Sequence, residues 1–154
     1  MAAAHAAVTA EPIDAARLLG SVVSDDDGAA LLFWGVVRNH NEGRPVSHLE
    51  YHAYAEMAER MMLRIGDEAI ARFGVGDVRV VHRVGRLAIG EASVAIAVAS
   101  PHRGEAYEAS RYVIEELKKR VPVWKREGYV DGESEWVPGF TLAAETPETA
   151  GRPL

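Results

Sequence analysis

Hydrophobic positions recur every three to four residues in three segments, and this spacing predicts three helices. The first covers about residues 12–23 and begins near Pro12, which is favoured in a first helical turn. The second covers residues 55–73 and is stopped by the sequence GVG. The third covers residues 102–121 and ends at Pro122, because proline cannot continue a helix. Its apolar side consists of Ala106, Ser110, Val113, Ile114, Leu117 and Val121.

Other segments carry the patterns of strands. Residues 29–37 form a continuous apolar, β-prone run, which predicts a strand buried on both faces, followed by a polar loop. Residues 46–54 alternate with period 2. Residues 78–85 and 93–100 add two more strands, and residues 123–137 are typical of a hairpin that turns at Asp131 and Gly132.

The order of these segments predicts an α+β domain with a largely antiparallel sheet. A chain of 154 residues suits one hydrophobic core, and no internal repeat or linker divides it. We expect one domain over residues 11–137. Residues 1–10 are Ala-rich and are expected to be a flexible N-terminus, and residues 138–154 have the composition of a mobile tail.

Composition and charge exclude several classes of protein. Hydrophobic residues make up 48% and charged residues 26%, which is typical of a folded globular protein. With 17 Lys and Arg against 23 Asp and Glu, the net charge of -6 argues against a general nucleic-acid binder. No apolar run approaches the roughly 18 to 20 residues of a membrane helix, and the N-terminus lacks a secretory pattern. A cytoplasmic protein without a membrane segment is therefore expected.

The chain contains no cysteine, so it has no thiolate nucleophile, disulfide or Cys-ligated metal. Any sulfur chemistry would use sulfur from another molecule. His48, Glu50 and His52 share one face of the predicted strand and could ligate zinc. The simpler interpretation is the polar face of a surface strand, so neither a metal nor a cofactor is predicted. Phosphate-loop, dinucleotide-binding and serine-hydrolase motifs are also absent.

The stretch ELKKRVPVWKRE, residues 116–127, holds five basic residues in twelve positions of an acidic protein. Lys119 and Arg120 have a structural explanation, because each follows a glutamate by four residues at a helix C-terminus. Lys118 lacks that preferred partner, and Lys125 lies beyond the proline that ends the helix.

A turn at Pro122 would bring Lys118 and Lys125 to one cavity, with Trp124 fixing the bend by burial. Two ammonium groups held close would repel each other and lower the pKa of at least one, which suits proton transfer or amine chemistry. From this cluster alone, a solvated basic surface remains the simpler interpretation.

Two strand ends add further cationic groups. Arg38 follows the apolar strand, and His102 and Arg103 stand where another strand meets a helix start, which favours an anion. Together, six residues would suit a compact, phosphorylated, anionic ligand: Arg38, His102, Arg103, Lys118, Lys125 and Arg126.

Five motifs occur in a fixed order between Gly28 and Trp136: FWGVVRNHN, LEYHAYAEMAE, HRVGRLAIGE, VASPHRGEAYEA and LKKRVPVWKRE. Each resembles a signature of the catalytic (large) subunit of molybdopterin synthase. The resemblance implies an α/β-hammerhead fold with an additional antiparallel β subdomain. It also implies conversion of cyclic pyranopterin monophosphate (precursor Z) to molybdopterin, with sulfur from the thiocarboxylated C-terminus of a small ubiquitin-like subunit. The implied assembly is a heterotetramer built on a homodimer of large subunits.

The resemblance also assigns roles to residues. Lys118 and Lys125 are implied as catalytic lysines, for proton transfer or a transient covalent link. Arg38, with His102 and Arg103, is implied to bind the pterin and its phosphate, in part across the dimer interface. Arg126 and Glu127 are implied to line the same pocket. Trp34 departs from the smaller aliphatic residue usual at its position, and His52 is given no role.

Two other functions fit the same residues. One is a non-catalytic α+β dimer that binds a phosphorylated metabolite, which would tolerate exchange of Lys118 or Lys125 for arginine, whereas amine chemistry would not. The other is local RNA binding through Trp124 and the lysines, which predicts steep salt dependence.

Overall fold

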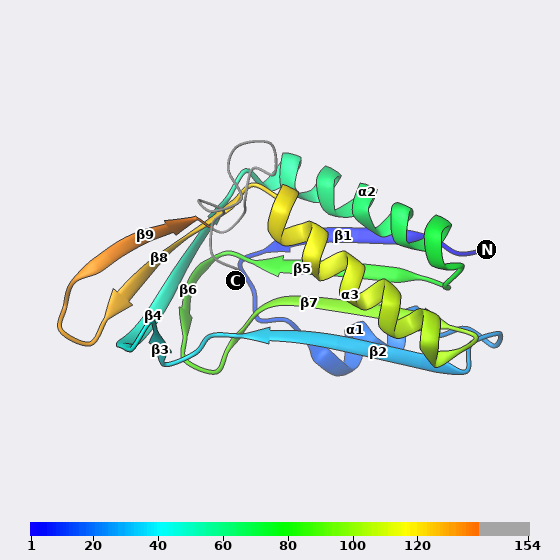
Figure 1. Cartoon of the computed structure of the whole chain (residues 1–154), viewed down its shortest axis with the longest axis horizontal. Coiled ribbons are helices and arrows are strands. Elements are labelled where there is room, and N and C mark those ends of the chain that lie inside the picture. The colour runs from blue at the N-terminus through cyan, green and yellow to red at the C-terminus, as the bar shows by residue number, and fades with distance from the viewer. Residues whose placement is uncertain (139–154) are drawn as a thin grey trace.

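The computed structural model describes residues 1–138, which form three helices and nine strands in two sheets (Figure 1). The helices are α1 (Ala15–Val22), α2 (Ala55–Phe73) and α3 (Arg103–Arg120). The strands are β1 (Ala4–Thr9), β2 (Ala29–Val36), β3 (His40–Asn41), β4 (Arg44–Ala53), β5 (Val78–Arg83), β6 (Gly85–Ala88), β7 (Ala92–Ser100), β8 (Val123–Tyr129) and β9 (Ser134–Pro138). Among these residues, no helix is both long and apolar enough to cross a membrane.

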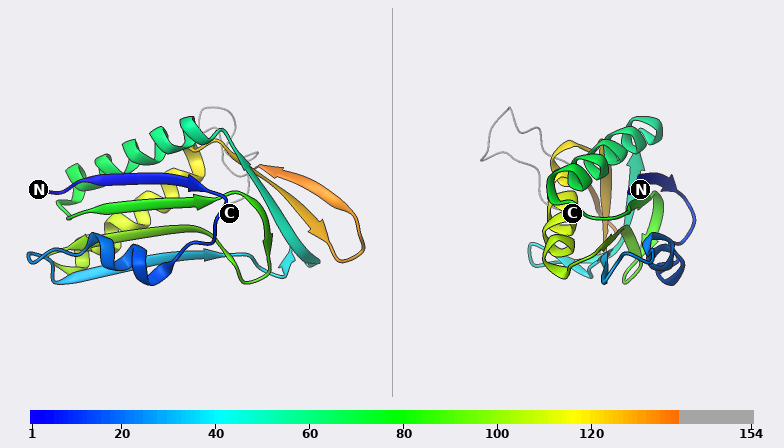
Figure 2. Two further views of the ribbon diagram at one scale, coloured as in Figure 1. Left: turned by 180° about the vertical axis from the view of Figure 1, so that it is seen from behind. Right: turned by 90° about the vertical axis from the view of Figure 1, so that its right-hand side faces the viewer.

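The first sheet has the strand order β1-β5-β7-β2, with α2 and α3 on one face and α1 on the other (Figure 2). The second has the order β3-β4-β8-β9, with β6 also paired to β4. Apart from the parallel pair β1 and β5, every strand pairing is antiparallel. The predicted α+β class with a separate antiparallel β unit is confirmed.

Strand β7 is the centre of the core. Every one of its residues is buried, because β5 and β2 flank it and helices pack on both faces. On one face Ile96 and Val98 join a large cluster with Met62 and Ile65 of α2 and Leu117 of α3. On the other face its small alanines meet α1. The strand that is buried on both faces is therefore β7, and not the strand predicted over residues 29–37.

For residues 29–37 themselves, the prediction of burial on both faces is wrong. Strand β2 lies at the edge of its sheet, and Trp34 and Val36 are 36% and 48% exposed. A continuous apolar run identifies a strand, but it does not show whether the strand has neighbouring strands on both sides or lies at the edge of the sheet. The polar loop that was expected to follow contains β3, which pairs with β4 through a turn at Glu42 and Gly43, both with positive φ.

The flexible N-terminus predicted for residues 1–10 is also wrong. Residues Ala4–Thr9 form β1, which runs parallel to β5 at the edge of the first sheet. The Val8 amide donates to a carboxylate oxygen of Glu59 on α2 at 2.8 Å, and the Ala3 amide donates to Asp77 at 2.8 Å. Alanine has a weak β preference, so the local sequence gives little sign of this strand.

The helices follow the predictions with small shifts. The bounds of α2 are as predicted, and Gly74 ends it in a left-handed conformation. Its buried stripe includes Ala58, Met62, Ile65 and Ala69, whereas Met57 is 48% exposed. Helix α1 begins later than expected, because the side chain of Asp14 caps it by accepting a bond from the Arg17 amide.

Strand β4 breaks the strict alternation that the sequence suggested. A register shift between Val46 and His48 lets Val46, Leu49 and Tyr51 all face the core. Strand β6, which pairs with β4, was not predicted. The hairpin of β8 and β9 is confirmed and turns at residues 131 and 132. Of the predicted tail, only Pro138 lies in the described part, and residues 139–154 lie outside it.

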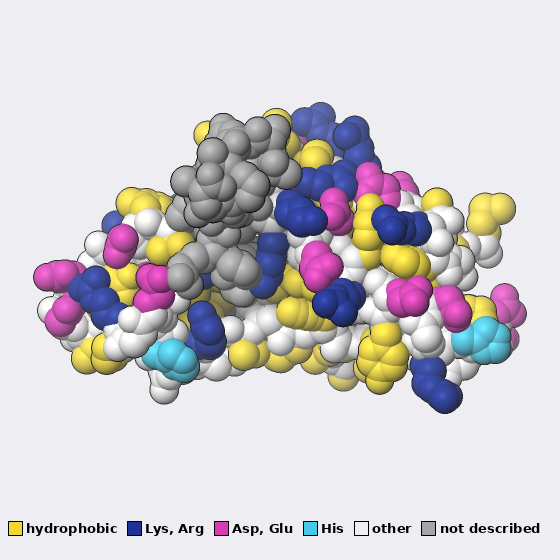
Figure 3. Space-filling model, in the orientation of Figure 1, with side chains coloured by type: hydrophobic (Ala, Val, Ile, Leu, Met, Phe, Trp, Pro, Cys, Tyr) yellow, Lys and Arg dark blue, Asp and Glu magenta, His cyan; other side chains and the backbone are white. Residues whose placement is uncertain are grey.

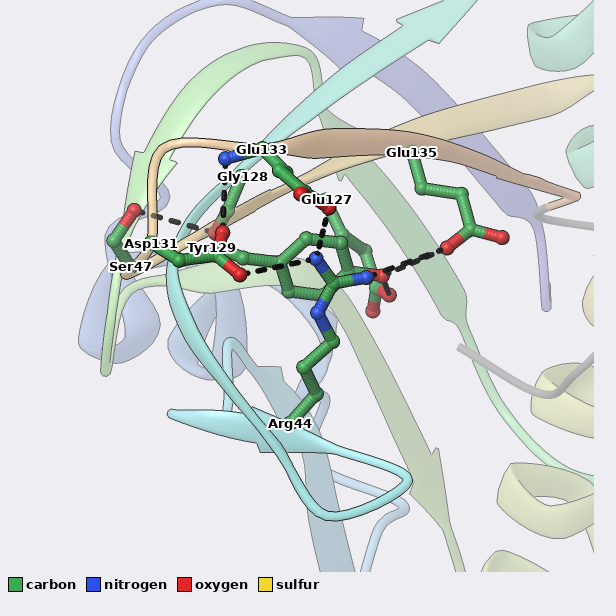
Figure 4. Close-up of polar contacts among 8 residues, drawn as sticks. All are labelled: Arg44, Ser47, Glu127, Gly128, Tyr129, Asp131, Glu133 and Glu135. Atoms are coloured by element: carbon green, nitrogen blue, oxygen red, sulfur yellow. Dashed lines mark hydrogen bonds and ion pairs between the residues drawn. The ribbon is translucent and has the colours of Figure 1, made fainter.

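Arg44 holds the hairpin turn against the start of β4 (Figure 4). Its guanidinium carbon lies 3.6 Å from the centre of the Tyr129 ring, and it pairs with Glu133 at 2.7 Å and Asp131 at 3.2 Å. The Glu133 contact is the main cause that raises the pKa of Arg44. Because several contacts converge on one guanidinium, this network orients β8 more strongly than an isolated surface pair would.

Replacing Gly66 by alanine should destabilise the protein, although alanine is the better helix former. A Cβ at this position of α2 would lie 2.8 Å from the Cβ of Ala4 on β1, so the helix must move away from the sheet. We expect a net loss of about 1 to 2 kcal/mol in unfolding free energy, measured by urea denaturation. Gly20 of α1 is the matched control, since a Cβ there meets nothing within 4 Å. Gly20→Ala should stabilise by about 0.5 to 1 kcal/mol, and equal effects at both sites would contradict this account.

His82 should contribute to acid destabilisation. It is fully buried, and burial lowers its pKa to about 4, whereas the unfolded chain keeps an ordinary value near 6.5. As the pH falls below 6.5, His82 binds a proton in the unfolded state but not in the folded state. The free energy of unfolding therefore decreases until the pH reaches about 4. Between pH 7 and pH 5 this loss amounts to about 2 kcal/mol. His82→Phe should remove that part of the pH dependence of urea denaturation, and the exposed control His52→Gln should keep it.

Candidate functional site

A pocket of about 160 Å³ opens where the end of β2 meets the second sheet and the last turns of α3. Its apolar wall comes from Phe33, Val36, Leu49, Val94 and Ile114. Its polar wall consists of Arg38, His40, Tyr51, Ser93, Lys118, Lys125 and Glu127. The pocket therefore concentrates cationic groups in a small, partly apolar space, where electrostatic interactions are stronger than in water.

Lys118 and Lys125 reach this pocket from different elements. Lys118 lies in the last turn of α3, and the chain then turns at Pro122 into β8. Strand β8 pairs with β4 so that Lys125 stands opposite Tyr51, which also lines the pocket. The prediction that a turn at the proline brings both lysines to one cavity is confirmed. Trp124 is half-buried and packs edge-on against Tyr54, with ring centres 4.8 Å apart.

Burial lowers the pKa of Lys118, and the positive charge of Arg38 lowers it further. The sequence had suggested repulsion between the two lysines as the cause, but desolvation and Arg38 account for the shift. Lys125 is only 5% exposed. Lys118 is therefore neutral in a larger fraction of molecules than an ordinary lysine, and Lys125 is almost completely shielded from solvent.

Glu127 faces the pocket from the same side of β8 as Lys125, because residues two apart in a strand share a face. It is 3% exposed, and its Oε1 accepts hydrogen bonds from Asn41 at 2.9 Å and from the Tyr129 hydroxyl at 2.8 Å. Burial and this carboxylate raise the pKa of Tyr129. The sequence missed Asn41 and Tyr129, although Tyr129 could have been found from its i+2 spacing to Glu127.

Arg126 points to the other face of β8, so the prediction that it lines the same pocket is wrong for a single chain. It donates to a carboxylate oxygen of Glu50 and lies 5.6 Å from the centre of the Trp136 ring. This pairing lowers the pKa of Glu50. Within residues 1–138 no cluster of three or more metal-ligating side chains occurs, and Glu50, once considered with His48 and His52, is instead engaged by Arg126.

His102 and Arg103 lie at the opposite end of α3 from Lys118. Both are exposed, and His102 is the N-cap residue of the helix without a side-chain cap bond. A helix of 18 residues is about 27 Å long, so these two side chains do not reach the pocket of their own chain. The structure thus assembles Arg38, Lys118, Lys125 and Glu127, and leaves Arg126, His102 and Arg103 outside.

The floor of the pocket contains polar groups that the sequence did not identify. Tyr51 and Ser93 are 3% and 4% exposed, and burial raises the pKa of Tyr51. Beneath Tyr51 lies the ring of His82, edge-on at 5.1 Å. Both hydroxyl residues line the pocket, and the Ser93 hydroxyl donates to the Gly35 carbonyl at 3.5 Å.

The rest of the visible surface is not a basic face. In Figure 3, Lys and Arg side chains are interspersed with Asp and Glu over the helices and the hairpin. Several of these are explicit pairs, such as Arg120 with Glu68 at 2.7 Å and Arg111 with Glu115 at 3.3 Å. The pocket is therefore a local concentration of positive charge in a protein of net charge -6. Such a site suits a compact anion rather than an extended polyanion.

Known proteins share both the sequence and this architecture. Residues 8–120 match the family described as MoaE protein. The molybdopterin synthase catalytic subunit of Halalkalibacterium halodurans is 41% identical over 144 residues, which cover 94% of this chain and 92% of that relative.

Solved structures agree with the sequence comparison. Molybdopterin synthase from Staphylococcus aureus superposes with a TM-score of 0.80 at 40% identity, covering 84% of this chain and 94% of that one. A chain from a Helicobacter pylori complex of subunits 1 and 2 of molybdopterin-converting factor has the same fold, with a TM-score of 0.71 at 20% identity, covering 92% and 96%. The resemblance seen in the five sequence motifs is confirmed, and the chain belongs to the MoaE family, with relatives named molybdopterin synthase catalytic subunit.

Proposed function

We propose that this protein is the catalytic subunit of a molybdopterin synthase, a sulfurtransferase that converts cyclic pyranopterin monophosphate to the dithiolene molybdopterin. The observation that carries the proposal is the convergence of Lys118, Lys125, Arg38 and Glu127 on one small pocket, in a chain that belongs to the MoaE family. A cyclic phosphate is an anion that a guanidinium such as that of Arg38 binds well. The two amines supply the groups that sulfur transfer requires.

The reaction needs proton transfer and stabilisation of developing charge. The thiocarboxylate sulfur forms a carbon–sulfur bond to the pterin in place of a carbon–oxygen bond, and water then cleaves the acyl–sulfur bond and releases the tail as a carboxylate. Negative charge develops on oxygen in these steps, and a nearby ammonium stabilises it. Lys118, whose pKa is lowered, has a larger neutral fraction near pH 7 than an ordinary lysine and suits proton transfer or a transient covalent link. Lys125 and Glu127 complete the charged wall of the same pocket.

The sulfur comes from a partner in this proposal, because the chain has no cysteine of its own. We propose a small ubiquitin-like subunit whose thiocarboxylated C-terminus enters the pocket. A volume of about 160 Å³ admits the end of an extended tail but not a folded domain. The Helicobacter pylori protein of the same fold, which was solved as a complex of two subunits, supports a second subunit here.

His102 and Arg103 enter the proposal through a second copy of the chain. They lie about 27 Å from the lysine end of α3, so a homodimer could place them at the partner's pocket, where they would meet the substrate phosphate. We propose this homodimer as the core of a heterotetramer with two small subunits. We propose that Arg126 contacts the substrate or partner only from outside the pocket, since its side chain pairs with Glu50 on the opposite face of β8.

Exchanging either lysine for arginine should abolish sulfur addition. Arginine keeps the positive charge but cannot act as a neutral amine, so Lys118→Arg and Lys125→Arg should each lower the rate by about 100-fold or more. The measurement is mass spectrometry of the pterin after mixing protein, precursor Z and thiocarboxylated small subunit. Lys119→Arg is the matched control, because Lys119 is 53% exposed and pairs with Glu116 outside the pocket.

The same experiment separates catalysis from binding alone. If the wild type forms the dithiolene and both pocket variants fail while Lys119→Arg succeeds, the amines take part in the chemistry. If the wild type binds precursor Z without gaining sulfur, and the arginine variants bind it equally well, the pocket is that of a non-catalytic metabolite-binding dimer.

Removing the charge of Arg38 should raise the pKa of Lys118. Burial would still hold this pKa below its usual range, but the repulsion from Arg38 would be gone. In Arg38→Gln, acylation of Lys118 by acetic anhydride should therefore begin at a higher pH than in the wild type, as measured by peptide mass spectrometry. Labelling of Lys119 serves as an internal control and should not change. An unchanged profile for Lys118 would show that Arg38 does not influence the amine.

A further inference from the structure

A second pocket, of about 290 Å³, lies on the other face of the first sheet, between α1 and strands β1 and β5. It shares no lining residue with the lysine pocket. Its polar lining consists of Thr9, Asp14, Arg17, Ser21 and Arg79. Neither the proposed synthase chemistry nor the sequence motifs give this pocket a role.

The strand register explains why the pocket forms here. His5 of β1, Arg79 of β5 and Ala97 of β7 stand side by side, so all three project from the face that carries α1. Helix α1 packs against β7 and β2, where Ala97 meets its apolar side. The adjoining face of β1 and β5 is not covered by the helix, as the left view of Figure 2 shows. The pocket is the space beside α1 on that uncovered face.

Arg79 lines this space from β5. Its Nε is buried and has no hydrogen-bond acceptor, which makes it one of two such buried side-chain atoms in residues 1–138. Buried donors are nearly always satisfied, so an unsatisfied one indicates an acceptor that the chain itself does not supply. Arg83, four residues along the chain on the same face of β5, shows the contrast, because it pairs with Glu91 at 3.0 Å.

The pocket contains a second guanidinium and only one carboxylate. The side chain of Arg17 forms no ion pair within residues 1–138 and lines the pocket from α1. Asp14 is the acidic member, and one of its oxygens accepts the Arg17 amide at 3.0 Å as the cap of α1. Thr9 accepts a bond from the Glu11 amide at 3.0 Å, so its hydroxyl proton can point to a ligand. Positive charge therefore exceeds negative charge in the pocket.

We propose that this pocket binds a phosphate group, from inorganic phosphate or a small phosphomonoester, between Arg79 and Arg17. Guanidinium groups present paired N–H donors that match phosphate oxygens, and a dianion would satisfy the buried Nε of Arg79. The volume of about 290 Å³ leaves room for a small organic group on the phosphate. This site is independent of the proposed synthase activity.

The test follows the Nε–Hε signal of Arg79 by proton–nitrogen NMR, assigned by its loss in Arg79→Gln. Sodium phosphate and phenyl phosphate are titrated separately, with sodium chloride at matched ionic strength as the reference. The Arg79 signal should move and saturate with either phosphate and not with chloride, while the signal of the paired Arg83 stays in place. Tighter binding of phenyl phosphate would identify a phosphomonoester as the ligand, and equal binding would identify phosphate itself.

Three variants test whether the NMR response comes from phosphate bound in this pocket. Arg17→Gln, on the exposed side of α1, should weaken binding by about tenfold or more as read at Arg79, since one charge-assisted contact is lost. Lys118→Gln, which alters the other pocket, and Arg111→Gln, on the exposed side of α3, should leave the titration unchanged. A response equal to that of chloride, or an affinity unaffected by Arg17→Gln, would overturn the proposal.

Discussion

The antiparallel pairing of β8 with β4 is the constraint on which the lysine pocket depends. It sets Lys125 opposite Tyr51 and Glu127 opposite Leu49, so that both charged groups face inward while Arg126 faces Glu50 outside. A slip of one residue would exchange the two faces and place Arg126 in the pocket. The register is held at its far end by the hairpin turn, where Arg44 stacks on Tyr129 and pairs with Glu133.

The pocket buries charge, and the fold offsets this unfavourable burial with local structure. Glu127 accepts two hydrogen bonds on one oxygen, from Asn41 and Tyr129, which replace part of its lost hydration. Lys118 lies in the last turn of α3, where the helix dipole favours a cation, while burial and Arg38 disfavour one. These opposing effects keep an amine in place and still make it easier to deprotonate, which is the property a proton-transfer group needs.

Local sequence predicted the parts of the fold whose signals are local. Periodicity predicted α2 and α3, and Pro122 at the end of α3 suggested a turn that could bring Lys118 and Lys125 to one cavity, as the pocket now shows. The basic cluster alone had favoured a solvated surface. Strand β1 was missed because alanine gives no strong preference, and β2 was taken for a central strand because an apolar run does not reveal its neighbours.

The residues of the site also divide into those that local sequence patterns place and those that only the folded chain brings together. Strand alternation already separates Arg126 from Lys125 and Glu127, so the prediction that all three line one pocket went against the local pattern. Asn41 lies 86 residues from Glu127 in the chain, and such a contact exists only in the folded protein. His102 and Arg103 are a different case, because their helix was predicted and only its length separates them from the pocket.

The first sheet separates two cationic sites, and their difference lies in how each charge is compensated. On the α3 side, Arg38 and Lys118 face a pocket that also contains Glu127. On the α1 side, Arg83 is neutralised by Glu91, but Arg79, four residues away in the same strand, has a buried nitrogen without an acceptor in residues 1–138. The acidic excess of the chain could have supplied a second carboxylate there, as it does for Arg44 and Arg120. Because β7 is buried along its whole length and the two pockets share no lining residue, the two proposed anions would bind at separate sites.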